Sequence, residues 1–173
     1  MPLDDRYLDA RFSVTKVLVV DDEPYMRKVV RALLMSIGVR TIYEASDGVA
    51  GLDAIRTMGP DLVIVDWEMP GLDGPGFIRM VRSPDTFPYP DVPIIMLTGH
   101  GERARVVEAM ETGVNEFLLK PVSSKALRDR MVAVVARPRP MIRRGDYYGP
   151  APRALSAALN ESRDAFQNLV LLN

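Results

Sequence analysis

The chain has 173 residues, with 22 Lys and Arg against 23 Asp and Glu, so its net charge at pH 7 is −1. This balance gives the molecule no overall field that would attract nucleic acid or an anionic membrane. The lack of cysteine in the sequence excludes disulfides, thiolate metal sites and a cysteine nucleophile. The length allows one ordinary domain plus an appendage. No apolar run approaches the roughly 20 residues of a membrane helix, and the N-terminus lacks a signal-peptide pattern, so we expect a cytoplasmic protein without a membrane span.

The first half of the chain predicts three strands separated by two helices. Residues 1–14 lack a strong hydrophobic period, so we expect them to form a loosely held N-terminal extension, with or without one helical turn. Short apolar runs predict strands at 16–20 and 62–65, and a further strand is predicted at 39–45, between the two helices. Apolar residues at three- and four-residue spacing predict amphipathic helices at 24–37 and 48–58, since Pro suits a first helical turn and Gly a stop.

The second half continues the alternation after a loop rich in Gly and Pro. Phe77, Ile78 and Val81 mark the inner side of a third helix. Residues 83–92 contain three prolines and are predicted to be an irregular surface insertion. Strands follow at 93–97 and 114–119, and helices at 102–112 and 123–136, the last with Ser123 or Ser124 as N-cap.

Five strands alternating with five helices predict an α/β fold with helices on both faces of a parallel sheet. A flavodoxin-like strand order of 2-1-3-4-5 is common for this pattern, and it makes the first and third strands neighbours at the point where a crevice opens. Ligands bind at the carboxyl ends of the strands in such sheets. Polar residues at these ends are therefore the candidate site.

Five polar residues stand at four of these strand ends. Asp21 and Asp22 follow the first strand, Asp66 the third, Thr98 the fourth and Lys120 the fifth. Three carboxylates in one crevice repel one another unless a cation lies among them. Oxygen ligands without histidine or cysteine suit Mg²⁺ better than Zn²⁺. We therefore expect Mg²⁺ as the cofactor.

An aspartate at such a metal site can act as a nucleophile and form an aspartyl phosphate. The charge on the phosphoryl oxygens must then be neutralised. The Lys120 ammonium and the Thr98 hydroxyl are suited to contact two of these oxygens while Mg²⁺ neutralises a third.

Four motifs resemble those of the receiver domain of two-component response regulators. They are Asp21-Asp22, Asp66-Trp-Glu-Met-Pro-Gly71, Leu97-Thr-Gly99 and Lys120-Pro121. The resemblance covers residues 15–137 and is closest to stand-alone, CheY-like receivers. It implies a response regulator in a phosphorelay, phosphorylated on Asp66 by a histidine kinase or a histidine phosphotransfer protein.

The resemblance also implies roles for the neighbours of Asp66. Asp21, Asp22, Asp66 and the main-chain carbonyl of Glu68 would hold Mg²⁺. Thr98 and Lys120 would contact the phosphate, and the Lys120-Pro121 bond would be cis. Phe117 matches an aromatic switch residue whose inward turn accompanies movement of Thr98, and without a hydroxyl it can report only by burial.

Each of these residues also has a plainer interpretation. Asp22 could cap the following helix, Thr98 could stabilise a turn, Lys120 could be a solvated charge and Glu68 an exposed loop charge. Phe117 is expected in the core in any case. His100, two residues beyond Thr98, could influence hydrolysis, but we expect it to be an exposed loop histidine and assign it no chemistry.

Two other function classes compete with the signalling interpretation. A phosphohydrolase can also use a nucleophilic aspartate, but such enzymes usually place a second carboxylate two residues after it on the first strand, whereas here the pair is adjacent. An unphosphorylated interaction scaffold would not need the full set of reactive residues. We therefore expect a protein that catalyses only its own phosphotransfer and dephosphorylation and is otherwise not an enzyme.

Residues 138–173 are predicted to be a linker rich in Pro and Arg followed by an amphipathic helix at 153–172. The arginines favour a solvated or self-docking segment over nucleic-acid binding. The tail is too short for a DNA-binding output domain. We expect signalling to a protein partner, or to a second copy of the chain, through the fourth helix, fifth strand and fifth helix, with the tail helix modulating that surface.

Overall fold

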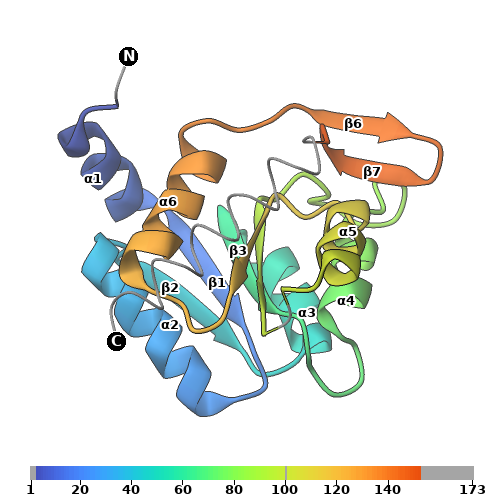
Figure 1. Cartoon of the computed structure of the whole chain (residues 1–173), viewed down its shortest axis with the longest axis horizontal. Helices are drawn as coiled ribbons and strands as arrows, with labels where there is room; N and C mark the ends of the chain where they lie inside the picture. The colour runs from blue at the N-terminus through green and yellow to red at the C-terminus, as the bar shows by residue number, and fades with distance from the viewer. Residues whose placement is uncertain (1–2, 100, 153–173) are drawn as a thin grey trace.

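A parallel sheet of five strands forms the centre of the computed structural model, which describes residues 3–99 and 101–152 (Figure 1). Its strands are β1 (Lys16–Val20), β2 (Thr41–Ala45), β3 (Leu62–Asp66), β4 (Ile94–Thr98) and β5 (Glu116–Leu119). They lie in the order β2-β1-β3-β4-β5. The sequence-based fold class, flavodoxin-like with strand order 2-1-3-4-5, is therefore confirmed.

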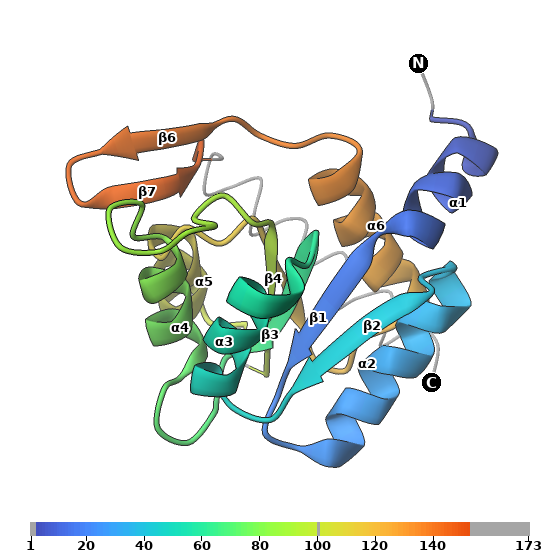
Figure 2. The same cartoon turned by 180° about the vertical axis from the view of Figure 1, so that it is seen from behind.

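Helices cover both faces of the sheet (Figures 1 and 2). One face carries α3 (Gly48–Met58), α4 (Gly74–Val81) and α5 (Arg103–Glu111), whereas the other carries α2 (Pro24–Ile37) and α6 (Ser124–Val135). The strand side chains alternate between two apolar clusters, one beneath each set of helices. Because both faces are covered, the central strands β3 and β4 are largely apolar and are buried along their whole length, whereas β2, at the edge of the sheet, carries Glu44 and is mostly half-buried.

Two strands are shorter than the segments predicted for them. The segment at 39–45 yields a strand only from Thr41, because the Val39 N–H donates to Leu34 O and so belongs to the end of α2. The run at 114–119 yields a strand only from Glu116. Val39 and Val114, the apolar residues just before these two strands, are nevertheless buried. In the sequence they therefore resemble strand residues.

The N-terminal extension is not loosely held, contrary to the sequence-based expectation. Residues Asp5–Val14 form a helix, α1, which Asp4 caps by accepting a hydrogen bond from Arg6 N at 3.1 Å. Leu8 and Phe12 are 4% and 0% exposed and join the apolar cluster beneath α2 and α6. Leu8 and Phe12 are the only buried residues of α1, and two apolar residues one turn apart make a hydrophobic period too weak to predict a helix.

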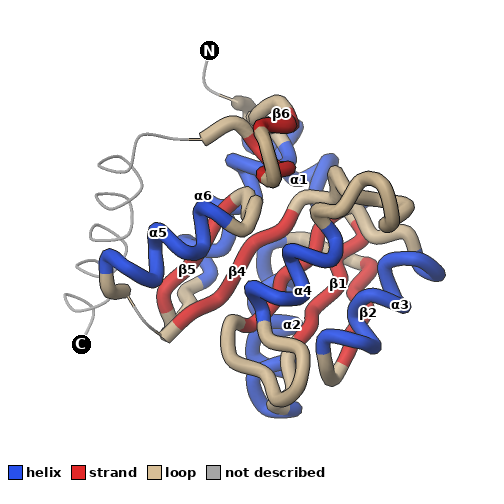
Figure 3. The backbone as a smooth tube through the Cα atoms, turned by 90° about the vertical axis from the view of Figure 1, so that its right-hand side faces the viewer, coloured by secondary structure: helices blue, strands red, loops and turns tan. Residues whose placement is uncertain are grey.

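The segment expected to be a linker contains a β-hairpin instead. The strands β6 (Met141–Arg144) and β7 (Tyr147–Pro150) pair antiparallel around Gly145, whose φ of +59° favours glycine. The hairpin lies beyond the ends of α4 and α5 (Figures 1 and 3). The helix predicted at 153–172 lies outside the described residues.

The proline-rich insertion between α4 and β4 has no helix or strand at 83–92, as predicted. It is nevertheless packed, because Phe87 and Val92 are buried in the cluster beneath α3, α4 and α5. Among the helices described, none combines the length and the apolar character that crossing a bilayer requires.

Candidate functional site

The carboxyl ends of β1 and β3 bring three aspartates together. Val20 pairs with Val65 across these neighbouring strands, so Asp21 and Asp66, the next residues on each chain, are placed side by side. Asp22 adds a third carboxylate. One oxygen from each of the three lies within 4.8 Å of the others.

Burial makes this cluster electrostatically costly. Asp21 is 1% exposed and Asp66 is 5% exposed. Burial raises the pKa of Asp21 from 3.8 to about 6, with the charge of Asp66 adding to the rise and the Glu23 backbone N–H opposing it. Burial also raises the pKa of Asp66, against the opposing effect of Lys120. A cation bound at the cluster would favour the ionised form of both carboxyl groups and so lower both pKa values.

The donor set fits Mg²⁺. Asp21 Oδ1 accepts a hydrogen bond from Glu23 N at 2.9 Å, whereas the buried Asp21 Oδ2 has no hydrogen-bond partner within the described part of the chain. A buried carboxylate oxygen without a partner calls for a cation. All three side chains offer hard oxygen ligands, which Mg²⁺ prefers. Glu68 lies at the rim with an exposed side chain, and its carbonyl as a fourth ligand stays a prediction.

Lys120 reaches this cluster from the end of β5. Its Nζ lies 2.7 Å from Asp66 Oδ1. Its backbone N–H donates to Thr98 O at 2.8 Å, which fixes the turn beside the end of β4. The Lys120–Pro121 peptide bond is cis, as the resemblance implied.

Thr98 and Phe117 lie on neighbouring strands and on one face of the sheet. Thr98 is the last residue of β4, one residue beyond Leu97, which pairs with Asp66. Phe117 pairs with Met96. Because side chains alternate along a strand, Thr98 and Phe117 both face the side covered by α5. Thr98 is 2% exposed and Phe117 is 8% exposed, so neither side chain is a free surface group.

The acidic cluster opens into a pocket of about 650 Å³. Its walls include Asp22, Asp66, Glu68, Gly99, Arg105 and Lys120. The Arg105 guanidinium lies over the Trp67 ring, 5.1 Å from its centroid. Sequence reasoning did not single out Arg105, because an arginine on an amphipathic helix carries no signal of what it will contact.

Sequence reasoning also missed a buried arginine at the end of α4. Arg82 is 5% exposed, and its guanidinium donates to Gly113 O, Val92 O and Asn115 Oδ1, each at 2.8 Å. Burial lowers its pKa from 12.5 to about 10. Because its partners are mostly backbone carbonyls distant in sequence, no local sequence pattern predicts these contacts. Arg82 ties the proline-rich insertion to the approach to β5.

Comparisons with known proteins agree with this geometry. The family model described as "Response regulator receiver domain" matches residues 17–132. Chemotaxis protein CheY-3 of Vibrio cholerae is 31% identical over 122 residues, which cover 70% of this chain and 92% of that protein. Chemotaxis protein CheY of Pseudomonas aeruginosa is also 31% identical, over 70% of this chain and 97% of that protein.

Solved structures give the same picture. Chemotaxis protein CheY4 of Vibrio cholerae superimposes with a TM-score of 0.62 at 29% identity, covering 69% of this chain and 98% of that one. A response regulator receiver domain protein from Clostridium thermocellum gives a TM-score of 0.64 at 31% identity, covering 72% of this chain and 96% of that one. With its strand-end motifs, its fold and these relatives, the chain belongs to the family of response regulator receiver domains, is CheY-like, and is a response regulator of two-component signalling.

Proposed function

We propose that Asp66 accepts a phosphoryl group from a histidine kinase or a histidine phosphotransfer protein, with Mg²⁺ held by Asp21, Asp22, Asp66 and the Glu68 carbonyl. The observation that carries this proposal is the cluster of three carboxylates with Lys120 on Asp66 at 2.7 Å. Bound Mg²⁺ would neutralise charge on the carboxylates and on the incoming phosphoryl group.

Asp66 performs the chemistry as a nucleophile. Its carboxylate oxygen attacks phosphorus as the bond between phosphorus and the donor's histidine nitrogen breaks, and the freed nitrogen keeps the bonding electron pair. The Lys120 ammonium, now on Asp66 Oδ1, is placed to contact a phosphoryl oxygen, and the Thr98 hydroxyl at the next strand end is the proposed contact for another. Attack of water on the aspartyl phosphate would later return Asp66 and release phosphate.

Phosphorylation would change the surface formed by α5, β5 and α6. Thr98 and Phe117 face the same side of the sheet beneath α5, which supports a coupled movement of the two. We infer that Phe117 acts as the switch by its degree of burial, and that the changed surface binds a protein partner or a second copy of the chain.

Acetyl phosphate with Mg²⁺ tests the phosphoacceptor. Wild-type protein should gain one phosphoryl group, detected by intact mass spectrometry, and the adduct should survive acid and be lost in base, as acyl phosphates are. Asp66→Asn should not be modified. Asp129→Asn removes an exposed carboxylate of α6 as the matched control and should be modified normally. Equal labelling of Asp66→Asn would refute the assignment, and turnover of many phosphate esters would favour a phosphohydrolase.

The output is tested separately by binding. Beryllium fluoride, a mimic of the aspartyl phosphate, should change in the presence of Mg²⁺ either the oligomeric state or the set of captured proteins. Asp66→Asn should abolish the change. An identical oligomer and identical captured proteins with and without beryllium fluoride would contradict signalling through this surface.

A further inference from the structure

The segment of residues 137–152, which we call the C-terminal clasp, is fastened to the rest of the domain by polar contacts. Arg139 donates to Asn115 O on the approach to β5 and to Ala151 O at 2.6 Å within the clasp. The Tyr148 hydroxyl donates to Asp91 in the proline-rich insertion. On the exposed side, Arg143 Nη2 lies 2.9 Å from Asp85 Oδ2.

Backbone shape also fits the clasp to the receiver. A Cβ added to Gly149 would lie 2.7 Å from the Gly113 Cα, and a Cβ added to Gly113 would lie 2.6 Å from Tyr148 O. The backbone segments at Gly113 and Gly149 therefore approach each other more closely than residues with a Cβ would allow. Asn115, whose backbone carbonyl accepts from Arg139, is itself held in place because its side-chain Oδ1 accepts from Arg82 Nη2 and from Ile94 N, each at 2.8 Å.

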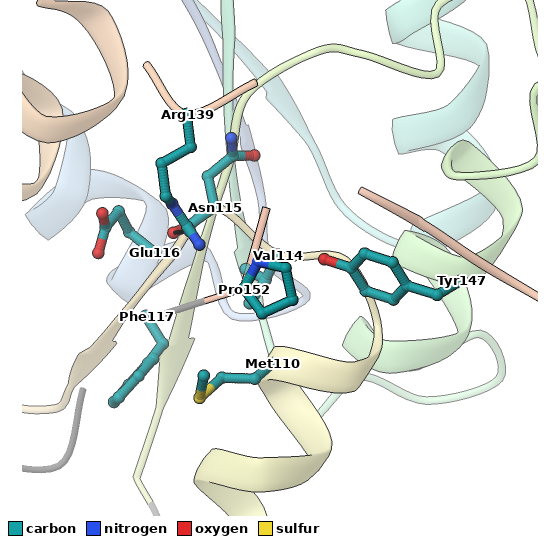
Figure 4. A pocket seen from close by; sticks show the side chains of 8 residues that line it. All are labelled: Met110, Val114, Asn115, Glu116, Phe117, Arg139, Tyr147 and Pro152. Carbon is teal, nitrogen blue, oxygen red and sulfur yellow. Dashed lines mark hydrogen bonds between the residues drawn. The ribbon is translucent and has the colours of Figure 1, made fainter. Parts of the chain in front are cut away.

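The clasp borders a small pocket beside the predicted switch residue Phe117, whose ring points away from the clasp side chains (Figure 4). The pocket is lined by residues of both parts: Met110, Val114, Asn115, Glu116 and Phe117 of the receiver and Arg139, Tyr147 and Pro152 of the clasp. The pocket holds about 30 Å³, which is room for a water molecule or two and not for an aromatic ring. While the clasp is docked, the Phe117 ring cannot turn into this space.

We propose that the C-terminal clasp acts as a steric stop that keeps Phe117 packed beneath α5 and so favours the ring position that accompanies phosphorylation. This inference rests on the proposed function, in which burial of Phe117 is the switch. Docking of the clasp and binding of a phosphoryl group at Asp66 would then favour the same arrangement. Because such coupling is reciprocal, loosening the clasp must weaken binding at Asp66 by the same factor.

Two variants loosen the clasp by independent means in the full chain. Gly149→Ala adds one methyl group where the Gly113 backbone leaves no room, and Arg139→Ala removes the donors to Asn115 O and Ala151 O. Arg144→Ala, which truncates an exposed arginine of the same hairpin, is the matched control. Hydrogen exchange of the peptide covering 141–150 measures undocking, and exchange of 116–119 measures loosening of β5 around Phe117.

The affinity readout is a titration with beryllium fluoride at fixed Mg²⁺. It can be followed by the fluorescence of Trp67, the single tryptophan of the chain and the neighbour of Asp66. Gly149→Ala and Arg139→Ala should speed exchange at 141–150 and at 116–119 and weaken the affinity about fivefold or more, the usual lower range of coupling between sites. Arg144→Ala should match wild type.

Several results would overturn the stop. Faster exchange at 141–150 with wild-type affinity would show that docking and the site are uncoupled, and an equal loss in Arg144→Ala would show an effect of charge alone. Unchanged exchange at 141–150 in both variants would mean that these contacts do not hold the clasp. If the wild-type protein itself binds no beryllium fluoride, the proposed function fails. The steric stop is tested separately by hydrogen exchange: if a variant undocks the clasp and exchange at 116–119 does not change, the stop is refuted.

Discussion

Lys120 Nζ lies 2.7 Å from Asp66 Oδ1, although the strands that carry them, β5 and β3, are separated by β4. The lysine extends past the end of the intervening strand, and its backbone N–H donates to Thr98 O there. Lys120 lowers the pKa of Asp66 against the larger effect of burial, which raises it. The contact therefore helps to keep Asp66, the proposed phosphoacceptor, ionised.

We predict that Lys120→Met slows phosphorylation of Asp66 by acetyl phosphate about a hundredfold, the typical loss when one donor to a developing charge is removed. It should also move the pH dependence of the rate to higher pH, because Asp66 loses the cation that favours its ionised form. Rates measured by quenched-flow or mass spectrometry across pH test both effects. Lys125→Met, on the exposed surface of α6, is the control and should react like wild type.

Binding of Mg²⁺ should depend on pH through Asp21. Its pKa is raised to about 6, and a metal ligand must be deprotonated. We therefore predict that affinity for Mg²⁺ is steady above pH 7 and falls as the pH drops below about 6. Titrations followed by Trp67 fluorescence would measure this, with Asp21→Asn as the variant that should lose most of the affinity. A flat affinity between pH 7 and pH 5 would contradict a role for Asp21 as ligand.

The same carboxyl group should weaken the metal-free fold near neutral pH. A pKa raised from 3.8 to about 6 on folding contributes stability that is present below pH 3.8 and lost as the pH rises through 6. Asp21→Asn should therefore raise the free energy of unfolding at pH 7 without Mg²⁺ by on the order of 2 kcal/mol. Urea denaturation at pH 7 and pH 4.5 checks the sign, since the gain should shrink at the lower pH. If Asp21→Asn were less stable than wild type at pH 7, the ionised Asp21 carboxylate would not destabilise the metal-free fold.

The parallel sheet and the acidic cluster could be predicted because both depend on short-range patterns. Strands buried on both faces are unbroken apolar runs, and in a parallel sheet the residue that follows each run must arrive at the same edge. Asp21, Asp66 and Lys120 met there as the pattern required. Helix ends were less predictable, as at Val39, whose N–H satisfies a helix carbonyl although its side chain resembles that of a strand residue.

The clasp and its arginine supports could not be predicted in the same way. The two residues of the hairpin turn, Gly145 and Asp146, were obscured by the surrounding prolines, which indicated a linker. Arg82 and Arg139 bind backbone carbonyls supplied by distant segments, and any residue can supply a carbonyl. The sequence therefore does not distinguish an arginine that is buried against backbone carbonyls from one that is solvated.

We predict that Arg82→Met destabilises the fold by roughly 3 kcal/mol, because several buried carbonyl and amide oxygens lose their donor at once. Arg82→Lys should recover only part of the loss, since an ammonium cannot reproduce the planar set of donors. Arg79→Ala, on the exposed side of α4, is the control and should change stability little. Denaturant unfolding measures all three, and a loss below about 1 kcal/mol for Arg82→Met would show that water replaces the guanidinium.

The N-terminal helix should be a structural part of the domain and not a dispensable extension. Phe12 is fully buried and Leu8 nearly so, both in the apolar cluster that α2 and α6 cover. Phe12→Ala should therefore lower the free energy of unfolding by about 3–5 kcal/mol, the usual range for removing a buried aromatic ring. Tyr7→Ala, which truncates a half-exposed aromatic side chain on the same helix, should cost far less. Circular dichroism and urea unfolding distinguish the two, and equal small losses would mean that α1 detaches without disturbing the core.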